Sequence, residues 1–204
     1  MKKFFTPLSL SIRHCKKWIL TIFFIYCFSC LTGIIMVHSG NSFALTYSDH
    51  IVGRANSNDK ASINYLKGNR VKAVLIDFSG NLFIGSVTQT FLGLGIIFPF
   101  LTTAYQGWIG GIVSVNRLHQ SRLIKIKSAL YYFIVIILQF IPYSLTIGSG
   151  LTLGIKTYNL NKGAKLLKFK IDKLALRDVV NIYMLAVPLF FLASCFEFLS
   201  NWNV

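Results

Sequence analysis

Four long apolar stretches alternate with polar and basic segments along the chain. They cover residues 18–37, 82–115, 128–155 and 179–196, and the second carries no charged residue. About 20 apolar residues in a helix are enough to cross the hydrocarbon core of a bilayer, which is about 30 Å thick. The pattern therefore predicts an all-α fold, a polytopic helical membrane protein.

The stretch 82–115 is too long for one straight crossing. Its 34 residues would extend about 51 Å as an α-helix, and Pro99 near its middle lacks the N–H that a helix interior needs. Small residues in both halves would let two helices pack closely in lipid. We therefore expect two short helices joined near Pro99. The five expected spans, with Pro-broken helices among them, are about 18–37, 82–98, 100–116, 129–155 and 178–197.

Charge assigns a direction to the first span. Residues 1–17 carry five basic side chains and no acidic one, which favours a cytoplasmic amino terminus and an uncleaved anchor at 18–37. The rival is a signal peptide cleaved near Ala44, but a 20-residue run exceeds the usual hydrophobic region of about 7–15 residues. Residues 38–80 would then form an extracytoplasmic polar loop, with a short helix around 61–75.

The distribution of lysine and arginine between the loops bears on the number of spans. Five spans place 12 basic residues on the cytoplasmic side and 9 outside, whereas four spans reverse these numbers. The positive-inside rule therefore favours five spans, with the carboxyl terminus outside. One crossing by residues 82–115 plus a re-entrant half-helix remains the alternative. Residues 164–178 have leucines at helical spacing among lysines, which fits a basic amphipathic helix at the membrane surface or a solvated loop.

The overall composition supports membrane residence. Hydrophobic residues make up 54% of the chain, and the net charge of +15 comes from basic residues that cluster between apolar runs. Anionic lipid headgroups are therefore the expected partner of the basic segments, and nucleic acid is not. We find no catalytic, cofactor-binding or metal-binding motif. Cys27 and Cys30 form a C-x-x-C, but an apolar setting disfavours a thiolate, so we expect them to serve packing.

A few polar residues lie in or beside the predicted spans. We expect Asn81, Gln89, Gln106 and Gln139 to form interhelical hydrogen bonds, worth about 0.6 kcal/mol each. Asp77 and Glu197 sit at the ends of spans, where an ionisable group is either a functional candidate or reaches water.

Four short motifs follow one another in the second half of the chain. They are Gly80-Asn81-Leu82; Tyr105-Gln106-Gly107 with Gly111; Gly150-Leu151-Thr152-Leu153-Gly154, reached through the span with Pro142; and Leu192 to Phe198 with Glu197. In order and rough spacing they resemble the stage II sporulation protein M family of integral membrane proteins over about residues 73–200. That family often has His-Gly-x-x-Glu before the proline span, where this chain has Val135 and Gln139. The resemblance implies that residues 81–200 are the family-like membrane region. The positions it implies as structural or partner-contact residues are Asn81, Gln106, Gly107, Gly111, Gln139, Pro142, Gly150, Gly154 and Glu197.

The resemblance also implies a function. The family's named member holds peptidoglycan-degrading enzymes at the septum during engulfment, so we expect a non-enzymatic membrane scaffold. Relatives in gene clusters for circular bacteriocins are linked to secretion or self-immunity, which makes an accessory role with a circular or other cationic bacteriocin the first alternative. A small transporter subunit is the second, since Pro99 and Pro142 could mark broken helices around a midplane site. The expected partners are a cell-wall hydrolase complex or exporter subunits, and further copies of this chain, in the cell membrane.

Overall fold

The computed structural model describes residues 2–116, 118–162 and 170–200, with the backbone alone for 2–5 and 55–57, and confirms an all-helical fold for them. The helices are α1 (Lys2–His38), α2 (Ser42–Asn58), α3 (Lys60–Leu66), α4 (Arg70–Ser79), the π-helix η1 (Gly80–Val87), α5 (Thr88–Leu92), the 3-10 turn η2 (Gly93–Gly95), α6 (Phe98–Ile112), α7 (Ile126–Leu160) and α8 (Lys173–Leu199).

Four helical stretches are long and apolar enough to cross a membrane. They are Thr6–His38, Arg70–Gly95, Ile126–Leu160 and Lys173–Leu199. These lengths are compatible with a multi-pass membrane protein. Helix α6 has 15 residues and extends about 22 Å, which is shorter than a hydrocarbon core of about 30 Å. The fifth span therefore stays a prediction.

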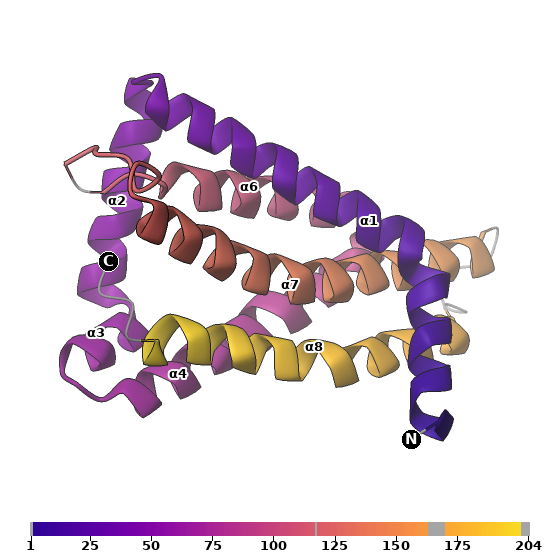
Figure 1. The fold of residues 1–204 in the computed structure, drawn as a ribbon. Helices are drawn as coiled ribbons and strands as arrows, with labels where there is room; N and C mark the ends of the chain where they lie inside the picture. The colour runs from indigo at the N-terminus through magenta and orange to yellow at the C-terminus, as the bar shows by residue number, and fades with distance from the viewer. Residues whose placement is uncertain (1, 117, 163–169, 201–204) are drawn as a thin grey trace.

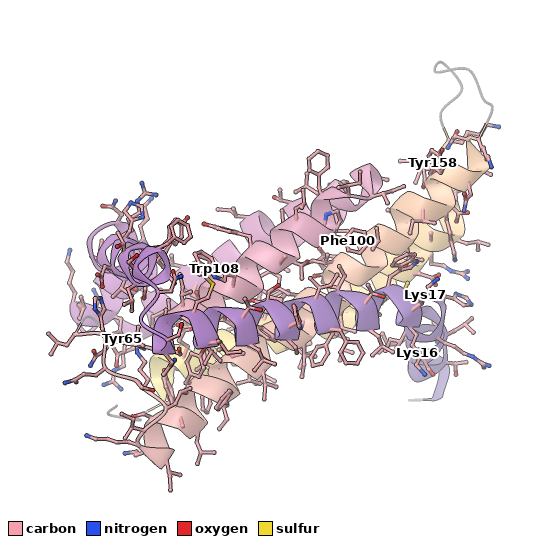
Figure 2. All side chains as sticks on the ribbon, turned by 90° about the horizontal axis from the view of Figure 1, so that it is seen from above. Lys16, Lys17, Tyr65, Phe100, Trp108 and Tyr158 are labelled. Carbon is pink, nitrogen blue, oxygen red and sulfur yellow. The ribbon has the colours of Figure 1, made fainter. Side chains whose placement is uncertain are left out.

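The chain runs back and forth along one axis (Figure 1). Helix α1 leads away from the amino terminus, the α4–η2 stretch returns, and α6, α7 and α8 each reverse direction again. Lys16, Lys17 and Tyr158 lie toward one end, which we call the amino-terminal end, and Tyr65 lies at the other (Figure 2). Helices α2 and α3 lie across that second end, which we call the α2–α3 end.

Helix α7 is the most enclosed of the four spanning stretches. In its most apolar part 44% of the residues are buried, against 22% to 33% in the other three. Around it, Tyr143, Ile147 and Leu151 of α7 share a core with Ile22 of α1 and Phe190 of α8. The side chains of α7 therefore make up a large part of the interior of the bundle.

Glycines from two of the motifs allow close helix contacts inside the molecule. A Cβ added at Gly107 would lie 2.5 Å from the carbonyl oxygen of Tyr26, and one at Gly111 would overlap that of Cys30, both on α1. On α7, a Cβ at Gly150 would lie 2.5 Å from the carbonyl oxygen of Thr90, and Gly154 meets Gly93 in the same way. Small residues in membrane helices allow backbones to approach this closely.

The expectation of Pro-broken helices is not confirmed. Pro142 and Pro188 lie inside helices that continue without interruption. The hydroxyl of Thr146 donates to the carbonyl oxygen of Pro142 at 3.0 Å, which adds a local bond where the proline ring disturbs the ladder. Pro99 stands in the first turn of α6, where its missing N–H costs nothing. The reversal before it falls at Ile96, whose φ of +53° is unusual for a β-branched residue.

Residues 38–80, which the sequence indicated as a polar loop, are helical over most of their length. The side chain of Asn41 accepts the Ala44 N–H at 3.0 Å and so begins α2. Asp59 accepts the Ser62 N–H at 2.8 Å and begins α3. Gly68, at φ +81°, makes the turn into α4. These caps and the turn at Gly68 make the segment helical, and the second stretch that is long and apolar enough to cross a membrane begins at Arg70 rather than at 82.

The basic segment 164–178 is only partly described. Its residues 164–169 lie outside the described part of the chain, so the amphipathic helix predicted there stays a prediction. Helix α8 begins at Lys173, because Asp172 accepts the Ala175 N–H at 2.7 Å as an N-cap.

Candidate functional site

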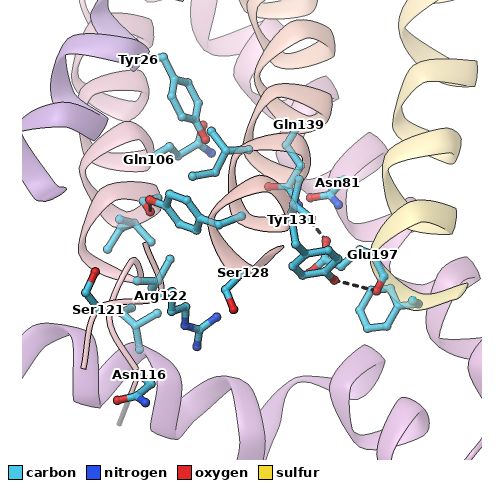
Figure 3. A pocket seen from close by; sticks show the side chains of 18 of the residues that line it. Tyr26, Asn81, Gln106, Asn116, Ser121, Arg122, Ser128, Tyr131, Gln139 and Glu197 are labelled. Carbon is cyan, nitrogen blue, oxygen red and sulfur yellow. Dashed lines mark hydrogen bonds between the residues drawn. The ribbon is translucent and has the colours of Figure 1, made fainter. Parts of the chain in front are cut away.

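A pocket of about 1160 Å³ lies between α6 and α7 and extends toward the α2–α3 end (Figure 3). We call it the interhelical pocket. Four of the residues singled out from the sequence line it: Asn81 of η1, Gln106 of α6, Gln139 of α7 and Glu197 of α8. Side chains far apart along the chain thus meet at one cavity.

The other five predicted positions do not line this pocket. Gly107, Gly111, Gly150 and Gly154 lie at the helix contacts described above, and Pro142 is buried within α7. The structure places these five where they support packing.

Hydrogen bonds between α4, η1, α7 and α8 form the wall of the pocket near Glu197. The amide of Gln139 donates to Glu197 Oε2 at 2.9 Å. One turn further along α7, the Tyr143 hydroxyl donates to Asn81 Oδ1 at 2.9 Å. Asn81 and Ser194 then donate to Asp77 Oδ2, at 3.0 Å and 2.6 Å. The predicted interhelical bonding of Asn81 and Gln139 is found, and it links α4 and η1 to α7 and α8.

Neither carboxylate in this wall has a cationic partner. Among the side chains that the structure describes, no lysine, arginine or histidine nitrogen lies within 4.0 Å of Asp77 or Glu197. Asp77 receives two hydrogen bonds, whereas Glu197 Oε2 receives one and its Oε1 receives none from a described residue. An uncompensated carboxylate is costly away from water. Because Glu197 lines the pocket, water or a ligand there can supply the hydrogen bonds that its carboxylate does not receive from described residues.

Tyrosines make up much of the remaining lining. They are Tyr26, Tyr65, Tyr105, Tyr131, Tyr132 and Tyr143. The Tyr131 hydroxyl donates to the backbone carbonyl of Glu197 at 3.2 Å, and Tyr132 donates to that of Gly110 at 2.6 Å. This group of tyrosines was not predicted from the sequence, although Tyr132, Gln139 and Tyr143 are spaced by seven and four residues. That spacing puts all three on one face of α7.

The connector between α6 and α7 contributes positive charge to the pocket. Arg122 and Lys125 line it, and Figure 3 shows Arg122 near Ser128 on the side away from Asn81. The backbone holds this segment in place, since the Arg122 N–H donates to the Ser114 carbonyl at 2.8 Å. His38 Nε2 lies 2.6 Å from Ser121 Oγ and ties the same turn to α1.

Among the described residues, no partner is found for the amide oxygen of Gln106, for which an interhelical hydrogen bond was predicted. Oε1 of Gln106 is buried and accepts no hydrogen bond from any residue that the structure describes. A buried amide oxygen without a donor costs about 1–3 kcal/mol. The side chain that carries this atom lines the pocket.

A second polar cluster surrounds Asp178 near the amino-terminal end. Its side chain is 3% exposed and accepts a hydrogen bond from Ser11 Oγ at 2.8 Å. His14 Nδ1 lies 3.0 Å from Asp178 Oδ2, and Lys156 Nζ lies 3.9 Å from the same oxygen. Asn181 donates to Ser11 Oγ at 3.0 Å. The cluster joins α1, α7 and α8, and no role for Asp178 was predicted from the sequence.

The groups that line the interhelical pocket can form hydrogen bonds and ionic contacts. Within the described ranges, no three His, Cys, Asp or Glu side chains gather as a metal site would require. Cys27 and Cys30 are free thiols on α1. The interhelical pocket offers a carboxylate, amides, phenols and a guanidinium, which are groups that orient a ligand by hydrogen bonds and charge.

Comparisons with family models, curated proteins and solved structures find no match to this chain. The resemblance to the stage II sporulation protein M family therefore stays a prediction from the four motifs.

Proposed function

We propose that this chain is a non-enzymatic accessory protein of the membrane that binds a ligand in the interhelical pocket, in support of secretion, transport or self-protection. The observation that carries the proposal is the pocket itself. About 1160 Å³ is ample for a small molecule or a short peptide, and η1, α6, α7 and α8 all contribute polar groups to one cavity.

The helices around the pocket support a binding role. Asn81 belongs to the π-helix η1, and α5, η2 and the reversal at Ile96 follow within 16 residues. π-Helices are rare and occur frequently at functional sites. Interrupted membrane helices commonly surround midplane binding sites in transporters. A stretch of this kind beside a polar cavity favours ligand binding over a purely packing role.

A membrane scaffold is the second candidate, and the outer face of α1 favours it. Phe24, Phe28, Leu31 and Ile35 are all exposed and recur at helical spacing. Lipid tails or a helix of another membrane protein would cover such a face. The motif glycines, in contrast, are used for contacts inside the chain.

A pocket-filling variant tests ligand binding. A Cβ at Gly110 would meet only Phe140 Cε1, at 4.0 Å, so Gly110→Phe should extend into the cavity that Gly110 lines. Gly80→Phe is the matched control, because a Cβ there meets nothing within 4 Å and Gly80 does not line the pocket.

Native mass spectrometry of the full chain, extracted in a mild detergent, provides the measurement. We expect a bound small molecule on the unaltered protein and on Gly80→Phe, and its loss from Gly110→Phe. If none of the three proteins carries a bound molecule, or if Gly110→Phe retains it, the pocket is not the ligand-binding site.

A growth assay addresses the physiological setting. Expression in a host sensitive to a cationic membrane-active peptide should raise the inhibitory dose of that peptide if the chain serves self-protection. Gly110→Phe should remove the effect while Gly80→Phe keeps it. Protection by both variants would show that it does not pass through the pocket.

A further inference from the structure

We infer that the ligand of the interhelical pocket is a zwitterion, with an ammonium group that pairs with Glu197 and an acidic group that pairs with Arg122. The inference rests on the proposed function, since it names the ligand class of the same pocket. Glu197 and Arg122, which can carry opposite charges, line one cavity and form no ion pair with each other.

Glu197 supplies the side that would hold the ammonium group. Its Oε2 accepts a hydrogen bond from the Gln139 amide, and its Oε1 accepts none from a described residue, so it can receive one from a ligand. Figure 3 shows Tyr131 beside it. Tyrosine rings attract cations through their negative faces, and a carboxylate next to them adds the counter-charge. An ammonium group uses both interactions, whereas a neutral ligand uses neither.

Arg122 supplies the opposite side. Its guanidinium forms no ion pair or side-chain hydrogen bond with the described part of the chain, and Lys125 lines the pocket three residues further on. A guanidinium binds carboxylates and phosphates through two parallel hydrogen bonds. An acidic group entering from the α2–α3 end would find this side chain available.

The two charges together select against simpler ligands. Arg122 and Lys125 would repel a plain cation, and Glu197 would repel a plain anion. A molecule with one charge of each sign at opposite ends gains both attractions. Ile109, Val113 and Ile136 also line the cavity and offer apolar contacts for the body of the ligand.

Two sources share this chemistry: the phosphoethanolamine headgroup of a lipid, and a short peptide with free ends. Calorimetric titration of the detergent-solubilised full chain distinguishes them. The first probe set is glycerophosphoethanolamine, ethanolamine and glycerophosphoglycerol, whose phosphodiester carries one negative charge. The second is trileucine, its N-acetylated form and its C-terminal amide. In one set, the zwitterion should bind about tenfold or more tightly than either singly charged member, as expected for one charged hydrogen bond.

Charge-removing variants assign each end of the ligand. Glu197→Gln should cut zwitterion affinity about tenfold or more, and leave the affinity for the anionic probe unchanged or higher. Arg122→Gln should do the converse, and Arg122→Lys should retain part of the affinity because it keeps the charge. Asp49→Asn and Lys127→Gln are controls outside the pocket lining and should bind as the unaltered chain does.

Equal affinity for zwitterionic and singly charged probes, or no binding of either zwitterion, would overturn the inference. The adduct that Gly110→Phe removes decides the proposed function separately. If that adduct is present and is not a zwitterion, the pocket binds a ligand of another class. If no adduct is present and no probe binds, both proposals fall.

Discussion

Asp178 and Glu197 are both carboxylates of α8, and the bundle treats them differently. Asp178 is met by a hydroxyl, an imidazole and an ammonium group from α1 and α7. Glu197 is met by one neutral amide and lines a cavity. The same residue class, on the same helix, is thus surrounded by partners at one end of the bundle and left with spare bonding capacity at the other.

The difference separates a structural acid from a candidate binding acid. A carboxylate that fixes helices is surrounded by donors from the protein itself, because unpaired charge is costly. A carboxylate that serves a ligand must keep an oxygen for it. Exposure to the cavity lowers the cost of that arrangement, since water can occupy the position until the ligand arrives.

The largest expected effect comes from removing the structural acid. Asp178→Ala leaves Ser11, His14 and Lys156 without their shared acceptor, so we expect the free energy of unfolding to fall by about 2–3 kcal/mol. Denaturation of the detergent-solubilised protein with sodium dodecyl sulfate measures it. Asp49→Asn breaks an exposed pair with His119, so its cost should stay below about 0.5 kcal/mol. Equal losses in both would show that Asp178 does not fix the helices.

A second variant would make the two acids alike. Gln139→Lys places an ammonium group beside Glu197, where Gln139 Nε2 now lies 2.9 Å from Oε2. The new cation would occupy the position proposed for the ligand, so zwitterion affinity should fall about tenfold or more while the unfolding midpoint does not fall. Calorimetry and thermal denaturation report the two quantities. Unchanged affinity would place the ligand elsewhere.

Truncating the candidate binding acid should cost less than truncating the structural one. Glu197→Ala removes one interhelical hydrogen bond and leaves the Gln139 amide beside a cavity, so we expect a loss of about 1 kcal/mol in unfolding free energy. Asp59→Ala is the comparison variant, because it removes only the N-cap of α3 and should lower the unfolding free energy by about 1 kcal/mol or less. A loss for Glu197→Ala as large as that for Asp178→Ala would end the distinction between the two acids.

The smallest effect concerns the hydroxyl that links η1 to α7. Tyr143→Phe keeps the ring in the core and removes only the hydrogen bond to Asn81, so the expected loss is about 0.6 kcal/mol. Thermal unfolding in detergent can resolve it against Tyr158→Phe, whose ring is exposed near the far end of α7. A loss several times larger would mean that Tyr143 and Asp77 act as one unit through Asn81.

Much of the fold follows from the apolar pattern, and the misses have physical causes. The runs beginning near residues 18, 128 and 179 mark α1, α7 and α8, because spanning helices need continuous apolar sequence. The helices between residues 42 and 79 depend on caps and on contacts with α6 and α8, and hydropathy does not show these. The break expected at Pro142 is not found, because neighbouring helices stabilise α7 around this residue.

The amide side chains and Glu197 of the candidate site could be predicted from the sequence, because polar residues in or beside apolar runs are conspicuous. That they share a cavity was not predictable, since this depends on how η1, α6, α7 and α8 pack. Arg122 lies in a polar connector where one basic residue looks like another. Only the folded arrangement shows that it shares the cavity with Glu197.

The π-helix η1 has a consequence for insertions and deletions. Asp77, Asn81, Ser86 and Thr90 all turn toward α7 and α8, and they are separated by four, five and four residues. An α-helix advances about 100° per residue, so Asp77 and Ser86 would lie on opposite sides of one. The five-residue step from Asn81 to Ser86 is one π turn, which restores the alignment. Deleting Ile84, whose side chain is exposed, would leave steps of four throughout and turn η1 into ordinary α-helix. The chain should therefore tolerate the loss of one residue here better than a gain.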